Sequence, residues 1–319
     1  MSPSSRLSVA PGRPFAERVT DLPMLGLGVS TEYGAAAAAG SLDVPRLARE
    51  YPQFTQFLEV GVETVKGLDA DALRWLEGGR PTTYHFLDVN LHEPTDFDDV
   101  WLKSVTDITD TLKPAWLCGD AGLWHFGRRD RGHMLLLPPI LSRDAARDAA
   151  AGITRLRDHT GYEVLPENPP GSFFIGDLHL LEYFAEVVTH ADSGMLIDAA
   201  HLAIYQQIQG HSAIDGLDDF PLERVVEIHV AGGSVRDHEG YRWVDDDHTA
   251  ALLPDTWTIF DALVDRCPNL RAVVFECERN TLDACLSSFG RLAERLAGTG
   301  LAPGLARARL SNPTRANEP

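Results

Sequence analysis

The chain has 319 residues, of which 44% are hydrophobic and 24% are charged, and its formal net charge is −19. This apolar fraction is enough for a large buried core, so the chain need not be disordered. A surface with such an excess of carboxylates repels phosphate backbones and anionic lipids, which argues against nucleic-acid and membrane partners.

The cysteines and the first residues of the chain point to one cellular location. Cys118, Cys267, Cys277 and Cys285 form neither a CxxC motif nor a dense disulfide framework, which is typical of reduced thiols. The first residues lack the apolar core of a secretory signal, and no uncharged apolar run is long enough to span a bilayer. We therefore expect a soluble, cytoplasmic protein.

Short apolar runs alternate with amphipathic stretches between two expected tails. We expect flexible tails over residues 1–20 and 301–319 and a single catalytic domain over residues 21–300. The predicted strands are 24–30, 56–62, 82–88, 115–119, 162–167, 194–198, 225–231 and 271–276. The predicted helices are 43–50, 69–77, 97–112, 142–159, 177–190, 199–209, 255–266 and 281–297.

This alternation predicts the fold. Near-continuous apolar strands indicate burial on both faces, and therefore a parallel sheet covered by helices. Eight strand–helix units in roughly 280 residues favour a closed (β/α)8 TIM barrel over an open sheet. Active sites of such barrels lie at the carboxyl ends of the strands, so residues at those ends are the first candidates for chemistry.

Polar side chains lie at or just after the ends of six successive predicted strands. They are His85, Asp120, Glu167 with Asn168, Asp198 with His201, His229, and Glu276, and the loop after the seventh strand adds Asp246 and His248. Carboxylates that converge in a semi-buried cavity repel one another unless cations neutralise them. Imidazole and carboxylate ligands without thiolate suit Fe, Mn, Zn or Co. The number of candidates predicts more than one metal ion, with a carboxylate bridging them.

His229 and Glu276 are the residues that we expect to be catalytic. His229 lies in an apolar run, and the glycines at 232 and 233 would let a ligand approach the backbone. Structural interpretations compete with these roles: Asp198 could cap a helix, and Glu167 with Asn168 could belong to a turn. We expect Cys118 to pack rather than react, because no dedicated oxyanion turn follows it. The sequence also has no G-x-S-x-G elbow, P-loop or G-x-G-x-x-G motif. The remaining histidines expected at the surface are His133, His159, His179, His190, His211 and His238.

The strand-end segments resemble those of a known family, the DUF692 multinuclear non-haem iron-dependent oxidative enzymes. The chain reads L-P-E-N-P from Leu165, M-L-I-D from Met195, R-V-V-E-I-H-V-A-G-G from Arg224, D-D-H from Asp246 and V-F-E from Val274. Each of these segments is similar to a motif of that family, and the stretch from Arg224 is the most specific match. The resemblance covers roughly residues 24–295.

The resemblance implies a TIM barrel that binds two or three iron ions and uses O2 as co-substrate. It implies that the iron ligands are His85, Glu167, Asp198 or Asn168, His229, Asp246, His248 and Glu276. Family substrates are often cysteine-containing peptides of natural-product biosynthesis, presented by a separate recognition protein. The reaction often removes a hydrogen β to the cysteine sulfur. A small amino-acid-like substrate is equally compatible with this chain.

The chain departs from the family pattern in two places. Where the family has Ser-Asp/Glu-His-Leu after the fourth strand, this chain has Asp120 followed by Ala121, and only His125 could replace the missing imidazole. Where the family has Asp-Val-Asn-Asn, this chain has Asp198-Ala-Ala-His201, a D-x-x-H spacing also found in sugar-isomerase-like barrels. Two alternatives therefore stay open: a divalent-metal sugar isomerase or epimerase using Mn, Co or Zn, and a non-catalytic metal-binding partner module.

Overall fold

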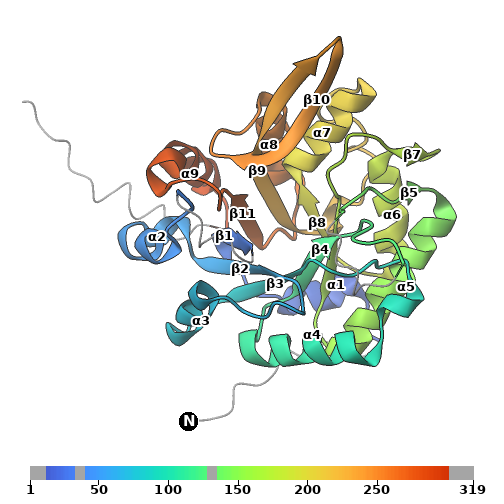
Figure 1. Ribbon diagram of the computed structural model, residues 1–319, viewed down its shortest axis with the longest axis horizontal. Coiled ribbons are helices and arrows are strands. Elements are labelled where there is room, and N and C mark those ends of the chain that lie inside the picture. The colour runs from blue at the N-terminus through green and yellow to red at the C-terminus, as the bar shows by residue number, and fades with distance from the viewer. Residues whose placement is uncertain (1–11, 33–39, 128–134, 302–319) are drawn as a thin grey trace, which may run out of the picture.

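The computed structural model describes residues 12–32, 40–127 and 135–301, and their central feature is a closed barrel of parallel strands (Figure 1). The barrel strands are β1 (Gly26–Glu32), β2 (Phe57–Val62), β3 (Thr82–Phe86), β4 (Leu117–Asp120), β6 (Val164–Glu167), β8 (Met195–Asp198), β9 (Val225–His238) and β11 (Ala272–Glu276). Each pairs with the next in this order, and β11 pairs back with β1, so the sheet closes. The predicted TIM barrel is confirmed.

Helices follow the strands and cover the outside of the barrel. They are α2 (Val44–Glu50), α3 (Ala70–Glu77), α4 (Asp99–Leu112), α5 (Arg143–Thr160), α6 (Leu180–Ala191), α7 (Ala199–Gln209), α8 (Pro254–Arg266) and α9 (Leu282–Leu296). Several begin at a side chain that accepts the otherwise unpaired N–H groups of the first turn, as Asp43, Asp98 and Ser142 do. No helix in the described ranges is long and apolar enough to cross a membrane.

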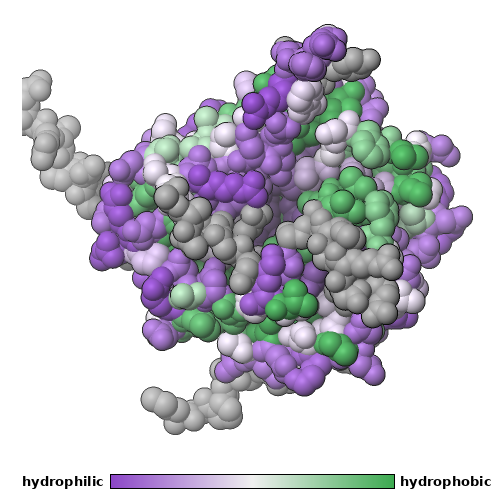
Figure 2. Space-filling model, in the orientation of Figure 1, coloured by the Kyte–Doolittle hydropathy of each residue, from purple (hydrophilic) through white to green (hydrophobic). Residues whose placement is uncertain are grey.

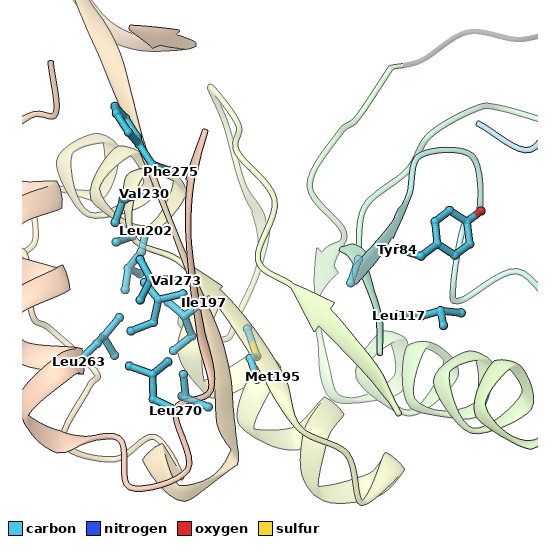
Figure 3. Packing of buried hydrophobic residues seen from close by; sticks show 14 of the residues in the cluster. Tyr84, Leu117, Met195, Ile197, Leu202, Val230, Leu263, Leu270, Val273 and Phe275 are labelled. Carbon is cyan, nitrogen blue, oxygen red and sulfur yellow. The ribbon is translucent and has the colours of Figure 1, made fainter. Parts of the chain in front are cut away.

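The main hydrophobic core lies between the strands and the helices. Ile197, Val230 and Val273 on the outer faces of the strands pack with Leu202 and Leu263 from α7 and α8 (Figure 3). All five side chains are buried. Because both faces of each strand are covered, the strands appear in the sequence as the unbroken apolar runs used for the prediction.

Inside the barrel, the residues change from apolar to polar along each strand. Side chains two positions apart point to the same face of a strand, so each strand contributes a lower and an upper residue to the interior. Such pairs are Phe57 and Glu59, Cys118 and Asp120, Leu165 and Glu167, Leu196 and Asp198, and Val274 and Glu276. The lower members form a second buried apolar cluster, while the upper members deliver carboxylates to the carboxyl-end rim.

Part of the expected N-terminal tail is instead folded onto the barrel. Helix α1 (Phe15–Arg18) and the turn η1 (Val19–Asp21) pack their apolar residues into the lower interior cluster. The Arg18 guanidinium, 5% exposed, pairs with the buried carboxylate of Glu163 at 2.9 Å. The expectation of a flexible tail was therefore wrong for residues 14–20, because a Pro- and Arg-rich composition does not reveal this long-range ion pair. Residues 1–11 and 302–319 lie outside the described ranges.

Strand β9 continues beyond the barrel and forms a hairpin with β10 (Tyr241–Thr249) (Figure 1). The end of this hairpin is hydrophilic (Figure 2). The region 245–248, expected to be a loop, is thus part of a strand, with a register irregularity between Asp245 and Thr249. Two further short strands, β5 (Ile140–Leu141) and β7 (Ile175–Gly176), form a separate parallel pair.

Candidate metal centre

The ten predicted site residues form one connected cluster at the carboxyl-end rim of the barrel. Contacts that are no longer than 3.9 Å connect neighbouring members of the cluster. A cavity of about 200 Å³ opens onto it. Its walls include His85, Asp120, Glu167, His201, Asp246, His248 and Glu276.

One part of the cluster, the His201 group, consists of His201, Asp246 and His248. Their potential ligand atoms all lie within 4.8 Å of one another. Asp246 Oδ2 is 3.1 Å from His201 Nε2 and 3.3 Å from His248 Nε2. Asp198 Oδ2 lies 3.9 Å from His201 Nε2. The hairpin irregularity allows this geometry, because His248 adopts a positive φ of 50° and thereby turns toward the barrel.

A second part, the His85 group, consists of His85, Asp120 and Glu167, whose ligand atoms also lie within 4.8 Å of one another. His85 Nε2 is 2.7 Å from Glu167 Oε2. Between the two groups lies His229, whose Nδ1 is 3.3 Å from Glu167 Oε1 and 3.4 Å from Glu276 Oε1.

Two carboxylates connect these parts. Glu167 presents Oε2 to His85 and Oε1 to His229, and Glu276 presents Oε1 to His229 and Oε2 toward His248 at 3.8 Å. Carboxylates placed in this way could bridge metal ions. The donor set is imidazole and carboxylate, which suits borderline metals such as Fe, Mn and Zn.

The electrostatics of the cluster require positive charge. Burial by itself lowers the pKa of His85, but the hydrogen bond to Glu167 and the nearby carboxylates outweigh burial and raise this pKa to about 10. Burial raises the pKa of Glu276, but the charges of His229 and His248 outweigh it and bring the pKa to about 2. Without metal, protonated imidazoles therefore neutralise the carboxylates. Metal ions would replace those protons.

Several buried oxygens of the cluster have no hydrogen-bond donor among the described residues. These are Asp120 Oδ1, Asp198 Oδ2, Asp246 Oδ1 and Glu276 Oε2. A buried carboxylate oxygen without a partner costs about 1–3 kcal/mol or more, so such atoms call for a ligand. All four oxygens belong to carboxylates of the cluster, so the residues fit metal ions by position as well as by chemistry.

Hydrogen bonds from outside the cluster orient two of the histidines. His248 Nδ1 lies 2.6 Å from Glu278 Oε1, so its Nε2 remains free to face Asp246. His201 Nδ1 donates to the backbone oxygen of Asn168 at 2.9 Å, so its Nε2 is likewise free for a metal. Such partners fix the tautomer of a metal-binding histidine.

Asn168 and His125 differ from the other candidates. The Asn168 side chain bonds the backbone N–H and C=O of Asp198, each at 3.0 Å, so its amide faces the chain of β8 and supports a positioning role. His125 does not replace the imidazole missing at Ala121: its two nitrogens lie 2.8 Å from Gly127 O and 2.9 Å from Asp96 Oδ2. An imidazole does lie beside Asp120, because His201 Nδ1 is 3.8 Å from Asp120 Oδ1.

The explanation given above for the glycines after His229 was wrong. A Cβ atom at Gly232 would lie 2.2 Å from the backbone oxygen of Thr249, so Gly232 allows β10 to cross closely rather than a ligand to approach. Sequence reasoning also left Glu59 and Glu278 out of the site, although both contact its histidines. The sequence did carry a signal for Glu59, because this charged residue interrupts the apolar run of β2.

Two of the histidines expected at the surface belong to a small group at the start of α6 and just after α7. His179, His211 and Asp215 have potential ligand atoms within 4.8 Å of one another. His179 Nδ1, however, accepts the backbone N–H of Leu181 and caps α6, which is a structural role. His133 lies outside the described ranges.

A closed parallel barrel with buried imidazoles and carboxylates at its carboxyl-end rim defines a candidate metal-dependent TIM barrel. Solved structures agree on the fold. An L-ribulose 3-epimerase matches with a TM-score of 0.50 and 14% identity over 92% of this chain and 100% of the other. A xylose isomerase-like TIM barrel protein from Mycobacterium smegmatis, in complex with magnesium, matches with a TM-score of 0.53 and 9% identity over 85% and 96% of the two chains.

Sequence comparison defines the family. The model of the family described as RiPP precursor modification enzyme MbnB/TglH/ChrH matches residues 42–287, and the chain belongs to this family. RiPPs are ribosomally synthesised and post-translationally modified peptides. A UPF0276 protein of a Caulobacter species is 26% identical over 252 residues, which are 76% of this chain and 85% of the relative. Another from Paraburkholderia phytofirmans is 27% identical over 216 residues, 66% and 70% of the two chains.

Proposed function

We propose that this protein is a multinuclear non-haem iron enzyme that uses O2 to modify a cysteine-containing RiPP precursor peptide. The observation that carries the proposal is the pair of carboxylates, Glu167 and Glu276, that each face two sets of potential ligands. A single-metal barrel needs no such sharing. Membership of a precursor modification family supports the peptide substrate.

The residues that would hold the metals follow from the geometry. The His201 group with Asp198 would hold one ion, the His85 group a second, and His229 with Glu167 and Glu276 would complete a third position between them. Bound iron would supply the one-electron chemistry that O2 activation and hydrogen removal require. The protein supplies ligands, orients them through Glu278 and Asn168, and excludes water, since the cluster lies in a narrow, largely buried cavity.

A larger cavity of about 920 Å³ adjoins the metal cavity, and Leu87 and Trp124 belong to the walls of both. Val65, Val100 and Phe126 line it and are 82%, 78% and 57% exposed, which suits apolar contacts with a peptide. The described residues of its wall include six carboxylates and neither Arg nor Lys. We propose that the segment of the precursor beside the reacting residue lies here and carries basic side chains.

The test is elemental analysis with Mössbauer spectroscopy on protein purified without oxygen, followed by O2-consumption assays with precursor peptide. We expect two or three iron ions per chain and O2 uptake that depends on the peptide. The variant His238→Ala, which alters a histidine 73% exposed on the hairpin, should behave as wild type. One zinc or manganese ion per chain without O2 uptake would contradict the proposal. Sugar turnover by such a protein would favour an isomerase.

A further inference from the structure

Glu59 on β2 is a buried carboxylate that lines the metal cavity beside His85 and His229. It is 1% exposed, and its Oε1 lies 3.0 Å from Nε2 of His229. Its other oxygen, Oε2, accepts hydrogen bonds from Thr83 Oγ1 and Cys118 Sγ, each at 3.1 Å. Thr83 lies on β3 and Cys118 on β4, so two neighbouring strands fix this carboxylate in place.

The two nitrogens of His229 have different surroundings. Nδ1 faces Glu167 and Glu276, the carboxylates shared between the proposed metal positions, whereas Nε2 faces Glu59 alone. A neutral imidazole carries its proton on one nitrogen and a lone pair on the other. A proton on Nε2 would face Glu59 Oε1, 3.0 Å away, and would leave the Nδ1 lone pair pointing at the shared carboxylates. His248 is arranged in the same way, with Glu278 behind it.

We propose that Glu59 is a positioning residue that fixes the tautomer and ring orientation of His229, so that Nδ1 serves as the metal ligand. This inference rests on the proposed metal-dependent function. Oε2 of Glu59 already accepts hydrogen bonds from Thr83 and Cys118. Its Oε1 belongs, with His85 and His229, to a group whose potential ligand atoms lie within 4.8 Å of one another, and the proposal assigns this oxygen to Nε2 of His229 rather than to a metal. In a cluster with shared ligands, a rotated His229 would disturb every ion that Glu167 and Glu276 help to bind.

The proposal also gives Cys118 a role. Burial raises the pKa of the Cys118 thiol well above its ordinary value, so the thiol stays protonated and donates to Glu59. A protonated thiol is a poor nucleophile, which agrees with the expectation that Cys118 does not react.

The experiment compares Mn²⁺ binding to metal-free forms of wild type, Glu59→Ala, Glu59→Gln and Thr83→Val, by competition titration and elemental analysis. Glu59→Ala should bind the same number of ions with about 10–100-fold weaker affinity, as expected for loss of an outer hydrogen-bond partner. Glu59→Gln keeps an acceptor for Nε2–H and should recover most of the affinity. Thr83→Val, which preserves shape but removes one donor, should lose less than Glu59→Ala.

Glu227→Gln is the matched control. Glu227 is also a fully buried barrel carboxylate, but it accepts from Trp116 Nε1 at 2.7 Å rather than holding a histidine. This variant should bind Mn²⁺ as wild type does, with circular dichroism reporting the fold of every variant.

Three outcomes overturn the inference. Loss of one whole equivalent of Mn²⁺ in Glu59→Gln would make Glu59 a ligand. Wild-type affinity in a folded Glu59→Ala would leave Glu59 without a role, and equal losses in Glu59→Ala and Glu227→Gln would indicate a general effect on the barrel interior. A wild-type protein that binds no transition metal would instead contradict the proposed function.

Discussion

A substitution at Asp198 tests whether the cluster is stabilised by bound cations. Its Oδ1 accepts the backbone N–H of His201 at 2.6 Å and so begins α7, whereas its Oδ2 is buried without a donor. Burial, followed by the charges of Glu276 and Glu167, raises the pKa of Asp198 from its ordinary 3.8 to about 7, against the opposing effect of His201. An ionised Asp198 should therefore destabilise the metal-free protein.

The substitution Asp198→Asn keeps the helix cap and removes the charge. A carboxyl whose pKa rises on folding binds its proton more tightly in the folded state, so its contribution to stability falls as the pH rises from 3.8 to about 7. Above pH 7 the buried carboxylate is ionised in the folded state, and this lowers the free energy of unfolding by roughly 4 kcal/mol at most. At pH 8 we expect the free energy of unfolding of the metal-free variant to be about 1–3 kcal/mol higher than that of metal-free wild type. This difference should vanish near pH 4.

The assay is urea denaturation of chelator-treated protein at several pH values, repeated with saturating Mn²⁺. Metal should stabilise Asp198→Asn less than wild type, because the stability added by a ligand that binds only the folded state rises with the logarithm of its affinity. Asp144→Asn is the control, since Asp144 also lies in the first turn of a helix but is 92% exposed. A metal-free Asp198→Asn that is less stable at pH 8, or that gains as much from Mn²⁺ as wild type, would refute the reasoning.

Three further predictions concern other parts of the molecule. His229→Ala and Glu276→Ala should each abolish turnover and lower the metal content while the circular dichroism spectrum stays unchanged; wild-type metal content in both would remove them from the ligand set. Val100→Lys should raise KM for a basic peptide more than Val100→Glu does, because the cavity wall is acidic, and equal effects would contradict this account. Glu163→Ala leaves Arg18 buried without its main partner and should lower the free energy of unfolding by about 3–5 kcal/mol, measured in urea; a loss below about 1 kcal/mol would mean that α1 adds little to stability.

The barrel and its rim were predictable because both follow from local pattern. Buried parallel strands produce continuous apolar runs, and the rule that barrel sites lie at strand ends sorted residues such as Glu167 and Glu276 without any structure. The assignment of Asp198 as a possible helix cap was also correct, since one of its oxygens caps α7 while the other faces the cluster. The two interpretations were not exclusive.

What could not be predicted depends on contacts between distant segments. The hairpin partner of β9 begins only after Gly240, and its acidic residues look like a solvated loop in the sequence. The anchoring of α1 depends on Arg18 meeting Glu163, 145 residues away. Glu59 lies in the middle of a strand rather than at its end, so a rule based on strand ends does not select it.

In the proposed multinuclear centre, the sharing of Glu167 and Glu276 would affect how metal ions load. Positions that share a donor would not set their affinities independently, because the first ion bound would fix the orientation of the common carboxylate for the next. Occupancy would then be a collective property of the rim, and substitution of either glutamate would affect two neighbouring positions at once. Partly loaded molecules should accordingly be scarce during reconstitution.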